Sequence, residues 1–190
     1  MYKENNILSK MITLERYVDI EKRKPITDRN IRELIGGPVK IRNVSGLSAS
    51  DSLPSLCPKV GSGLVLFWQS KTGKVGHWNL VLRHSDHYEF FDSYGLLPLQ
   101  VANKTTHDGG VRCMKLLRGH NVKYGRYAFQ KRSDDVQTCG RFVAFRYNCH
   151  AFNYEEFKKL LQYRGVAPDD LITLLTIHVD FSHINKKKLE

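Results

Sequence analysis

Three short apolar segments in the middle of the chain constrain the fold most strongly. Residues 64–68 (LVLFW), 77–82 (HWNLVL) and 88–92 (YEFFD) are rich in β-branched and aromatic residues. The connections at 71–74 and 84–87 are turn-like and too short to hold a crossover helix. Consecutive segments must therefore pair antiparallel, and the pattern predicts a three-stranded meander.

A short helix is predicted ahead of these strands. Thr27 or Asp28 would cap a helix over Arg29–Ile35, and Gly36 follows the last apolar residue, where glycine commonly ends a helix. Residues 44–63 are rich in Ser, Gly and Pro and are predicted to form a loop.

The last third of the chain is predicted to be helical. Residues 139–149 contain no proline and carry apolar residues at helical spacing. Asn153 and Glu156 resemble a capping box at the start of a helix over about 153–163, and a further helix is expected over about 168–177.

Together these elements predict a single α+β domain. The chain has 190 residues with 41% hydrophobic and 26% charged, values that suit one globular domain and exclude wholesale disorder. We expect an N-terminal arm with helices over 1–35, a core over 60–152 and C-terminal helices over 153–190. Strands in the middle with helices at both ends are typical of the α+β class.

Charge and cysteine content bear on partners and compartment. Thirty Lys and Arg against nineteen Asp and Glu give a net charge of +11, which suits an anionic partner such as DNA, or simply solubility. No apolar run reaches the roughly 18 residues of a membrane span, and no CxxC pair occurs. We therefore expect a soluble protein of a reducing, intracellular compartment that is not secreted.

Cys139 is the first candidate for chemistry, because it stands directly before the helical pattern 139–149. A cysteine at a helix N-terminus meets the positive end of the helix dipole and unpaired N–H groups, which stabilise its thiolate. Gly140 would leave room beside the sulfur for a substrate carbonyl. The segment also fits a small buried cysteine, but the other three cysteines have no comparable setting.

His77 and Asp92 are the candidate base and its orienting carboxylate. His77 begins the second predicted strand and Asp92 ends the third, so a hairpin with its turn at 84–87 brings both to the same end of the sheet. The carboxylate would accept the Nδ1–H and leave Nε2 facing the thiol of Cys139. Taken alone, each residue also fits an ordinary structural role.

An oxyanion donor has two candidates. Gln130 and Gln137 precede Cys139 by nine and two residues. Either carboxamide would reach a carbonyl oxygen beside the sulfur, with the Cys139 backbone N–H as the second donor.

The order His, Asp, Gln, Cys resembles the adenovirus-protease and Ulp1-like cysteine peptidases over about residues 60–152. The Thr-Cys-Gly-Arg-Phe form, with Arg146 downstream, is most similar to the branch found in virophages and Polinton-like elements. The pieces that carry the resemblance are Gly76-His77-Trp78, Phe91-Asp92-Ser93-Tyr94-Gly95 and Thr138-Cys139-Gly140-Arg141-Phe142.

The resemblance implies a role for each residue. It makes Cys139 the nucleophile, His77 the general base and Asp92 its orienter. It further implies a papain-like or adenain-like core, in which the cysteine begins a helix packed on a mixed or antiparallel sheet. The implied enzyme is a monomer without metal or cofactor that cleaves viral capsid or other structural precursors, in the virion and in the host-cell cytoplasm or virus factory. Adenoviral relatives also use DNA and a small peptide as cofactors.

The glutamine departs from the family pattern. The family residue most often stands six or seven positions before the cysteine, where this chain has Arg132 and Ser133. We place the donor at Gln130, which follows the apolar stretch 127–129, and keep Gln137 as the alternative.

Other functions fit parts of the same pattern. A ubiquitin- or SUMO-like-protein peptidase would keep the chemistry and change the substrate, and an acyltransferase would pass the thioester to another acceptor. A basic nucleic-acid-binding module without enzymatic activity would use only the charge. A zinc site is the weakest alternative, because its candidate ligands lack finger-like spacing. Those candidates are Cys113, His120, Cys149 and His150.

Overall fold

The computed structural model describes residues 14–70, 76–105, 109–162 and 165–187. A five-stranded mixed sheet forms its centre, with strand order β1-β2-β3-β4-β5. The strands are β1 (Lys40–Asn43), β2 (Gly63–Gln69), β3 (Gly76–Arg83), β4 (Tyr88–Asp92) and β5 (Val122–Tyr124). The antiparallel pairing of β2, β3 and β4 confirms the predicted meander. The predicted turn at 71–74 lies outside the described residues.

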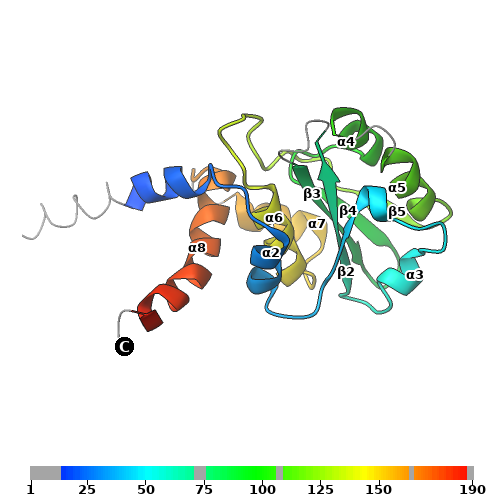
Figure 1. The fold of residues 1–190 in the computed structure, drawn as a ribbon, viewed down its shortest axis with the longest axis horizontal. Helices are drawn as coiled ribbons and strands as arrows, with labels where there is room; N and C mark the ends of the chain where they lie inside the picture. Colours follow the sequence, from blue (N-terminus) through cyan, green and yellow to red (C-terminus); the bar gives the residue numbers. More distant parts are fainter. Residues whose placement is uncertain (1–13, 71–75, 106–108, 163–164, 188–190) are drawn as a thin grey trace, which may run out of the picture.

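The two edge strands were not predicted. Strand β1 pairs parallel with β2, and β5 pairs parallel with β4, so the sheet is mixed. Both parallel pairings join segments that are separated by other elements, as parallel strands require. The α+β class is confirmed (Figure 1).

The helices follow the local signals in most places. Helix α2 (Asp28–Ile35) is capped by Thr27 at its start and by Gly36 after its last residue, and the φ of Gly36, 71°, lies in the left-handed region. Asn153 and Glu156 form the predicted capping box of α7. The described helices are residues 14–21, α2 (Asp28–Ile35), α3 (Leu53–Leu56), α4 (Pro98–Lys104), α5 (Gly109–Leu117), α6 (Cys139–Asn148), α7 (Tyr154–Leu161) and α8 (Pro168–Lys187).

Three regions differ from the predictions. The segment 44–63 is not a plain loop, because it holds the 3-10 helix η1 (Val44–Gly46), α3 and the start of β2. Helices α4 and α5 lie between β4 and β5, so the middle of the chain is not purely β. Helix α8 does not end near residue 177 but continues to Lys187.

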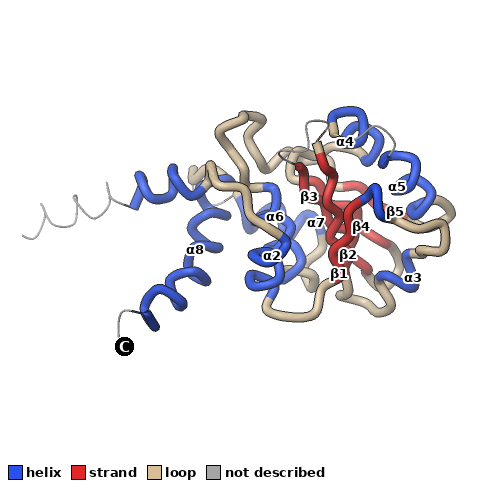
Figure 2. The backbone as a smooth tube through the Cα atoms, in the orientation of Figure 1, coloured by secondary structure: helices blue, strands red, loops and turns tan. Residues whose placement is uncertain are grey.

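Helices cover both faces of the sheet, as the ribbon and tube views show (Figures 1 and 2). On one face, Leu66, Trp68 and Phe90 pack with residues of α3, α4 and α5. On the other face, Leu80 and Phe91 pack with residues of α2, α6, α7 and α8. The N-terminus of α6 therefore reaches the sheet at the end where β3 begins and β4 ends.

Candidate active site

The β3–β4 hairpin places His77 beside Asp92. Its register pairs Asn79 with Asp92 and Arg83 with Tyr88, so His77 lies two residues beyond the strand partner of Asp92. The Nε2 atom of His77 is 2.6 Å from Oδ2 of Asp92. Both side chains are buried, with 8% of His77 and none of Asp92 exposed. The short turn thus brings a base and a carboxylate into direct contact.

The orientation of the imidazole differs from the prediction. We expected Nδ1 to bind the carboxylate and Nε2 to face the thiol, but Nε2 binds Asp92. Nδ1 is therefore the ring nitrogen left for Cys139. The strand register does not decide which nitrogen faces the carboxylate, because that depends on the rotation of the side chain.

Asp92 is held as an anion by several donors. Its Oδ1 accepts the backbone N–H groups of Tyr94 at 2.8 Å and Leu96 at 3.0 Å. Its Oδ2 accepts the side-chain amide of Asn79 at 2.6 Å as well as His77. Burial acts to raise the pKa of Asp92, but His77 and these hydrogen bonds outweigh it and hold the pKa below its ordinary value.

Cys139 is the first residue of α6 and lies against the same histidine. Only 7% of it is exposed. Burial alone would lower the pKa of His77, but the Asp92 carboxylate and a hydrogen bond with Cys139 outweigh burial and raise it to about 10. The ring of Tyr94 stacks on the imidazole, with ring centroids 5.1 Å apart and planes 20° apart. The imidazole of His77 therefore lies between the sulfur of Cys139 and the carboxylate of Asp92 and contacts both.

The other cysteines are in a different electrostatic setting. All four are free thiols. Burial raises the pKa of Cys57 and of Cys113 to about 12, and it also raises the pKa of Cys149. A thiol with such a pKa is almost wholly protonated near neutral pH and is a poor nucleophile. Among the described side chains, a histidine is a hydrogen-bond partner of Cys139.

Both candidate oxyanion glutamines are anchored near this site. The Nε2 atom of Gln130 donates to the Val136 carbonyl at 2.9 Å, and its Oε1 accepts the Ser93 hydroxyl at 2.7 Å. Gln137 donates from Nε2 to the Asp134 carbonyl at 2.9 Å. Gln130 is buried beside the residue that follows Asp92, whereas Gln137 lines an open cleft next to Cys139.

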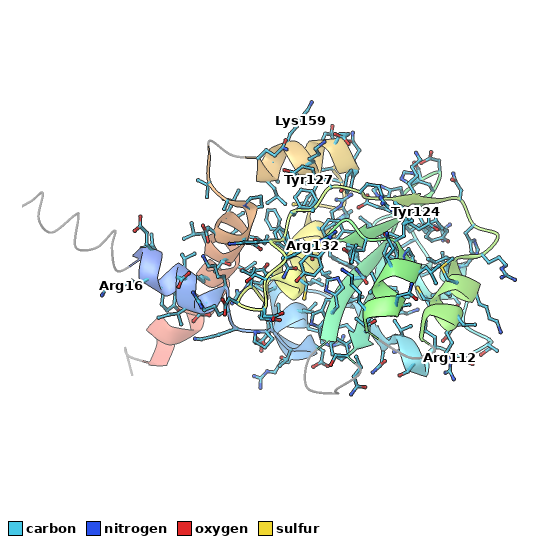
Figure 3. All side chains as sticks on the ribbon, turned by 90° about the horizontal axis from the view of Figure 1, so that it is seen from above. Arg16, Arg112, Tyr124, Tyr127, Arg132 and Lys159 are labelled. Atoms are coloured by element: carbon cyan, nitrogen blue, oxygen red, sulfur yellow. The ribbon has the colours of Figure 1, made fainter. Side chains whose placement is uncertain are left out.

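The positions of the usual family glutamine hold residues of another kind. Arg132 is exposed on the loop that leads to α6 (Figure 3) and donates to the Tyr94 carbonyl at 3.5 Å. Ser133 accepts the backbone N–H of Asp135 at 3.3 Å. Arginine carries charge rather than a neutral amide, and this serine hydroxyl is engaged within its own loop.

Residues from both ends of the chain hold the loop before Cys139. The backbone N–H of Gln137 donates to the Lys22 carbonyl at 2.7 Å. One carboxylate of α8, Asp169, accepts the Thr138 hydroxyl at 2.5 Å and the Lys131 backbone N–H at 2.8 Å. The N-terminal arm and α8 therefore fix both ends of the segment 131–138.

The N-terminal arm also forms a wall of the cleft beside Cys139. The cleft has a volume of about 470 Å³ and is lined by apolar side chains that include Ile26, Phe67 and Trp78. The indole of Trp78 donates to the Ile26 carbonyl at 3.3 Å. A Cβ on Gly140 would lie 2.6 Å from Cγ1 of Ile26. Close packing of the arm therefore gives Gly140 a structural reason that the sequence did not indicate.

The described residues show neither a metal-binding cluster nor a membrane-spanning helix. Within the ranges given above, no group of three or more His, Cys, Asp or Glu side chains is arranged to hold a metal ion. Over the same ranges, none of the helices combines the length and the apolar character that crossing a bilayer requires.

Comparison with known proteins gives one informative relative. No family model matches the chain. An uncharacterized protein of Sputnik virophage, V9, is 28% identical over 166 residues, which cover 80% of this chain and 94% of that protein. The similarity supports a viral origin. It extends over most of both chains and therefore includes the segments that carry the candidate triad.

The buried His77–Asp92 pair gives a test by pH. The pKa of His77 is raised from 6.5 to about 10, so the folded state holds a proton that the unfolded state releases. This stabilisation is complete below pH 6.5 and is lost as the pH rises toward 10. We expect the free energy of unfolding, from urea titrations, to fall with pH above about 6.5 by at most ~1.4 kcal/mol per pH unit.

A histidine variant isolates this effect. In His77→Gln the free energy of unfolding should change little with pH between about pH 6.5 and 8.5. Above this range the raised pKa values of Cys57 and Cys113 also make the free energy of unfolding fall with pH. His150→Gln, at an exposed histidine, serves as the matched control and should keep the wild-type slope. Equal slopes for wild type and His77→Gln would contradict the raised pKa.

Proposed function

We propose that this chain is a cysteine endopeptidase that cleaves viral structural precursor proteins, with Cys139, His77 and Asp92 as its catalytic triad. The observation that carries the proposal is the buried bond from His77 to Asp92, together with the contact between the same imidazole and Cys139. A packed helix that begins at this cysteine on a mixed sheet supports a papain-like arrangement of the core.

The geometry suits acyl transfer through a thioester. Cys139 and His77 form a thiolate–imidazolium pair, in which Nδ1 of the ring faces the sulfur and Asp92 stabilises the imidazolium through Nε2. The thiolate attacks the peptide carbonyl carbon, and the C–N bond breaks as the imidazolium protonates the departing amine. His77 then takes a proton from water, the resulting hydroxide attacks the thioester, and the C–S bond breaks to release the acid and restore the thiolate–imidazolium pair.

Gln130 is the proposed oxyanion donor. The Ser93 hydroxyl fixes its Oε1, so the amide group cannot rotate without losing that bond. One N–H of Nε2 binds the Val136 carbonyl, and the second N–H is directed by the same fixed plane. We propose that this second N–H and the backbone N–H of Cys139 stabilise the tetrahedral oxyanion.

The two glutamines are separable by mutation. Gln130→Ala should lower kcat by about 10²–10³-fold with little change in KM, since an oxyanion donor acts mainly in the transition state. Gln137→Ala removes an amide from the cleft rim and should alter KM more than kcat. The check is steady-state kinetics on one peptide, with thermal unfolding of both variants as the control; the reverse pattern would assign the role to Gln137.

The viral origin of the chain bears on the class of its substrate. The similarity to a virophage protein favours a substrate made by the virus itself, and capsid or other structural precursors are our proposal. The net charge of +11 is compatible with DNA as an additional partner during assembly.

The deciding experiment measures cleavage directly. Purified enzyme is mixed with the structural proteins of the virus that encodes it, and new termini are mapped by mass spectrometry. We expect discrete new termini in one or more precursors. Ubiquitin and SUMO fusions form a parallel arm, and cleavage of those fusions alone would replace the proposal with a ubiquitin-like-protein peptidase. Acetyl transfer from acetyl-CoA without any cleavage would favour an acyltransferase.

A further inference from the structure

We propose that Asn79 is a positioning residue of the triad, which holds the Asp92 carboxylate in the orientation that binds His77. The inference rests on the proposed function and goes beyond the triad, because Asn79 touches neither the sulfur nor the imidazole in any hydrogen bond of the described structure. It acts through the carboxylate alone.

The contact is direct and buried. Asn79 lies opposite Asp92 in the β3–β4 register, and its Nδ2 is 2.6 Å from Oδ2 of Asp92. The same amide group donates to the Phe91 carbonyl at 3.3 Å. Neither Asn79 nor Asp92 is exposed to solvent. Rotation of the amide by 180° would place its oxygen against two acceptors, so the orientation of the donor is determined by its neighbours.

Packing alone does not explain an asparagine at this position. Its Oδ1 is buried and has no hydrogen-bond partner in the described structure. An unpaired buried oxygen costs stability, which an apolar side chain of similar size would avoid. Val81, two residues further along β3 and so on the same side of the strand, is apolar and buried. The amide donor is therefore the property that distinguishes Asn79 from its neighbour.

The donor acts on the oxygen that matters for catalysis. Oδ2 of Asp92 accepts both Asn79 and His77, while Oδ1 accepts two backbone N–H groups. Within the described part of the chain, Asn79 and His77 are the side chains that hydrogen-bond to this carboxylate. The Asn79 donor keeps the Asp92 carboxylate anionic and oriented toward His77. It thereby supports the imidazolium that pairs with the Cys139 thiolate.

The groups that face the imidazole define what a pH measurement reports. Asp92 binds Nε2, Cys139 lies within hydrogen-bonding reach of the ring, and Tyr94 stacks on it. Loss of the Asn79 donor weakens Asp92 as a partner of the imidazolium. The thiolate of Cys139 then loses part of its cationic support, and its formation shifts to higher pH.

The test measures alkylation of Cys139 by iodoacetamide across pH 4–9, with peptide mapping to separate the four cysteines. Asn79→Leu keeps the size of the side chain and removes the donor. We expect the acid limb of the Cys139 profile to move up by about 0.5–1 pH unit. Asn79→Asp, which places an acceptor where the donor stood, should move it further in the same direction. Thr105→Val, which removes a buried hydroxyl at the C-cap of α4, is the control for general loosening and should leave the limb unmoved.

The outcomes separate this inference from the proposed function. If wild-type Cys139 reacts no faster than Cys149 below pH 7, the proposed function fails. If wild-type Cys139 reacts fast and both Asn79 variants reproduce its profile, the positioning role is overturned and the peptidase proposal stands. Should Asn79→Leu not fold, as judged by circular dichroism, the profile of Asn79→Asp decides alone.

Discussion

Replacement of Cys139 by alanine is expected to abolish peptide-bond cleavage and to leave the fold intact. In the proposed mechanism the Cys139 thiolate forms the acyl bond. Burial raises the pKa of the three other cysteines, so they cannot take its place. Removal of a triad nucleophile typically costs at least about 10⁴-fold in kcat. The measurement is the rate of appearance of new termini from a structural precursor, at enzyme concentrations at which wild type completes the reaction.

The fold should tolerate this change because only one sulfur atom is lost. Cys139 is a small side chain at the start of α6, and the aromatic packing of that helix comes from other residues, such as Phe142. Cys149→Ala, just past the end of the same helix, is the matched control and should retain full activity. Cleavage retained by Cys139→Ala, or lost in Cys149→Ala with an intact fold, would refute the assignment of the nucleophile.

Short-range rules predicted much of the fold correctly. The caps of α2 and α7 depend on residues three apart, such as Thr27 with Asn30 and Asn153 with Glu156, so the sequence alone contains the necessary geometry. The β3–β4 hairpin is similar, because its short turn sets the register. That register is what brings His77 within 2.6 Å of Asp92.

The same register contained a signal that we did not use. Once the turn at 84–87 is accepted, Asn79 must lie opposite Asp92, and an amide there is within reach of the carboxylate. Pro98 likewise stands at the first position of α4, where proline commonly opens a helix. Neither the Asn79–Asp92 contact nor helix α4 was predicted, although the residues that indicate them lie close together in the sequence.

Other features could not be derived from local patterns. The parallel pairing of β1 with β2 depends on segments more than twenty residues apart, for which no short-range rule exists. Which imidazole nitrogen faces the carboxylate depends on side-chain rotation, so spacing could not choose between Nδ1 and Nε2. The packing of Ile26 over Gly140 joins the arm to α6 and has no signature in either segment.

A large effect on stability is expected from Arg146→Met. The guanidinium donates twice to Glu89, from Nε at 2.8 Å and from Nη2 at 2.7 Å, and both side chains are buried. It also donates to the carbonyls of Cys149 and Phe152, which ties the end of α6 to the following turn. Removal of one partner leaves a buried carboxylate without its main counter-charge, and we expect a loss of about 3–5 kcal/mol in the free energy of unfolding.

The loss should depend on pH in a defined direction. Burial acts to raise the pKa of Glu89, but its bonds with Arg146 and His84 outweigh burial and lower it, so the wild-type pair stabilises the fold above pH 4.5 and loses that contribution as the pH falls. Without Arg146, burial prevails and the pKa of Glu89 rises, so the folded variant gains a proton that the unfolded chain does not hold. The difference in unfolding free energy between wild type and Arg146→Met should therefore shrink as the pH falls through about 4.5.

Two further variants separate the buried pair from an ordinary surface pair. Arg29→Met breaks an exposed pair with Glu33 and should barely move the urea midpoint. The double variant Glu89→Gln with Arg146→Met removes the stranded charge and should recover part of the loss, because a neutral amide is less costly to bury than an unpaired carboxylate. If Arg146→Met is as mild as Arg29→Met, or if the double variant is no more stable than Arg146→Met, the pair is not the buried, coupled interaction that these distances describe.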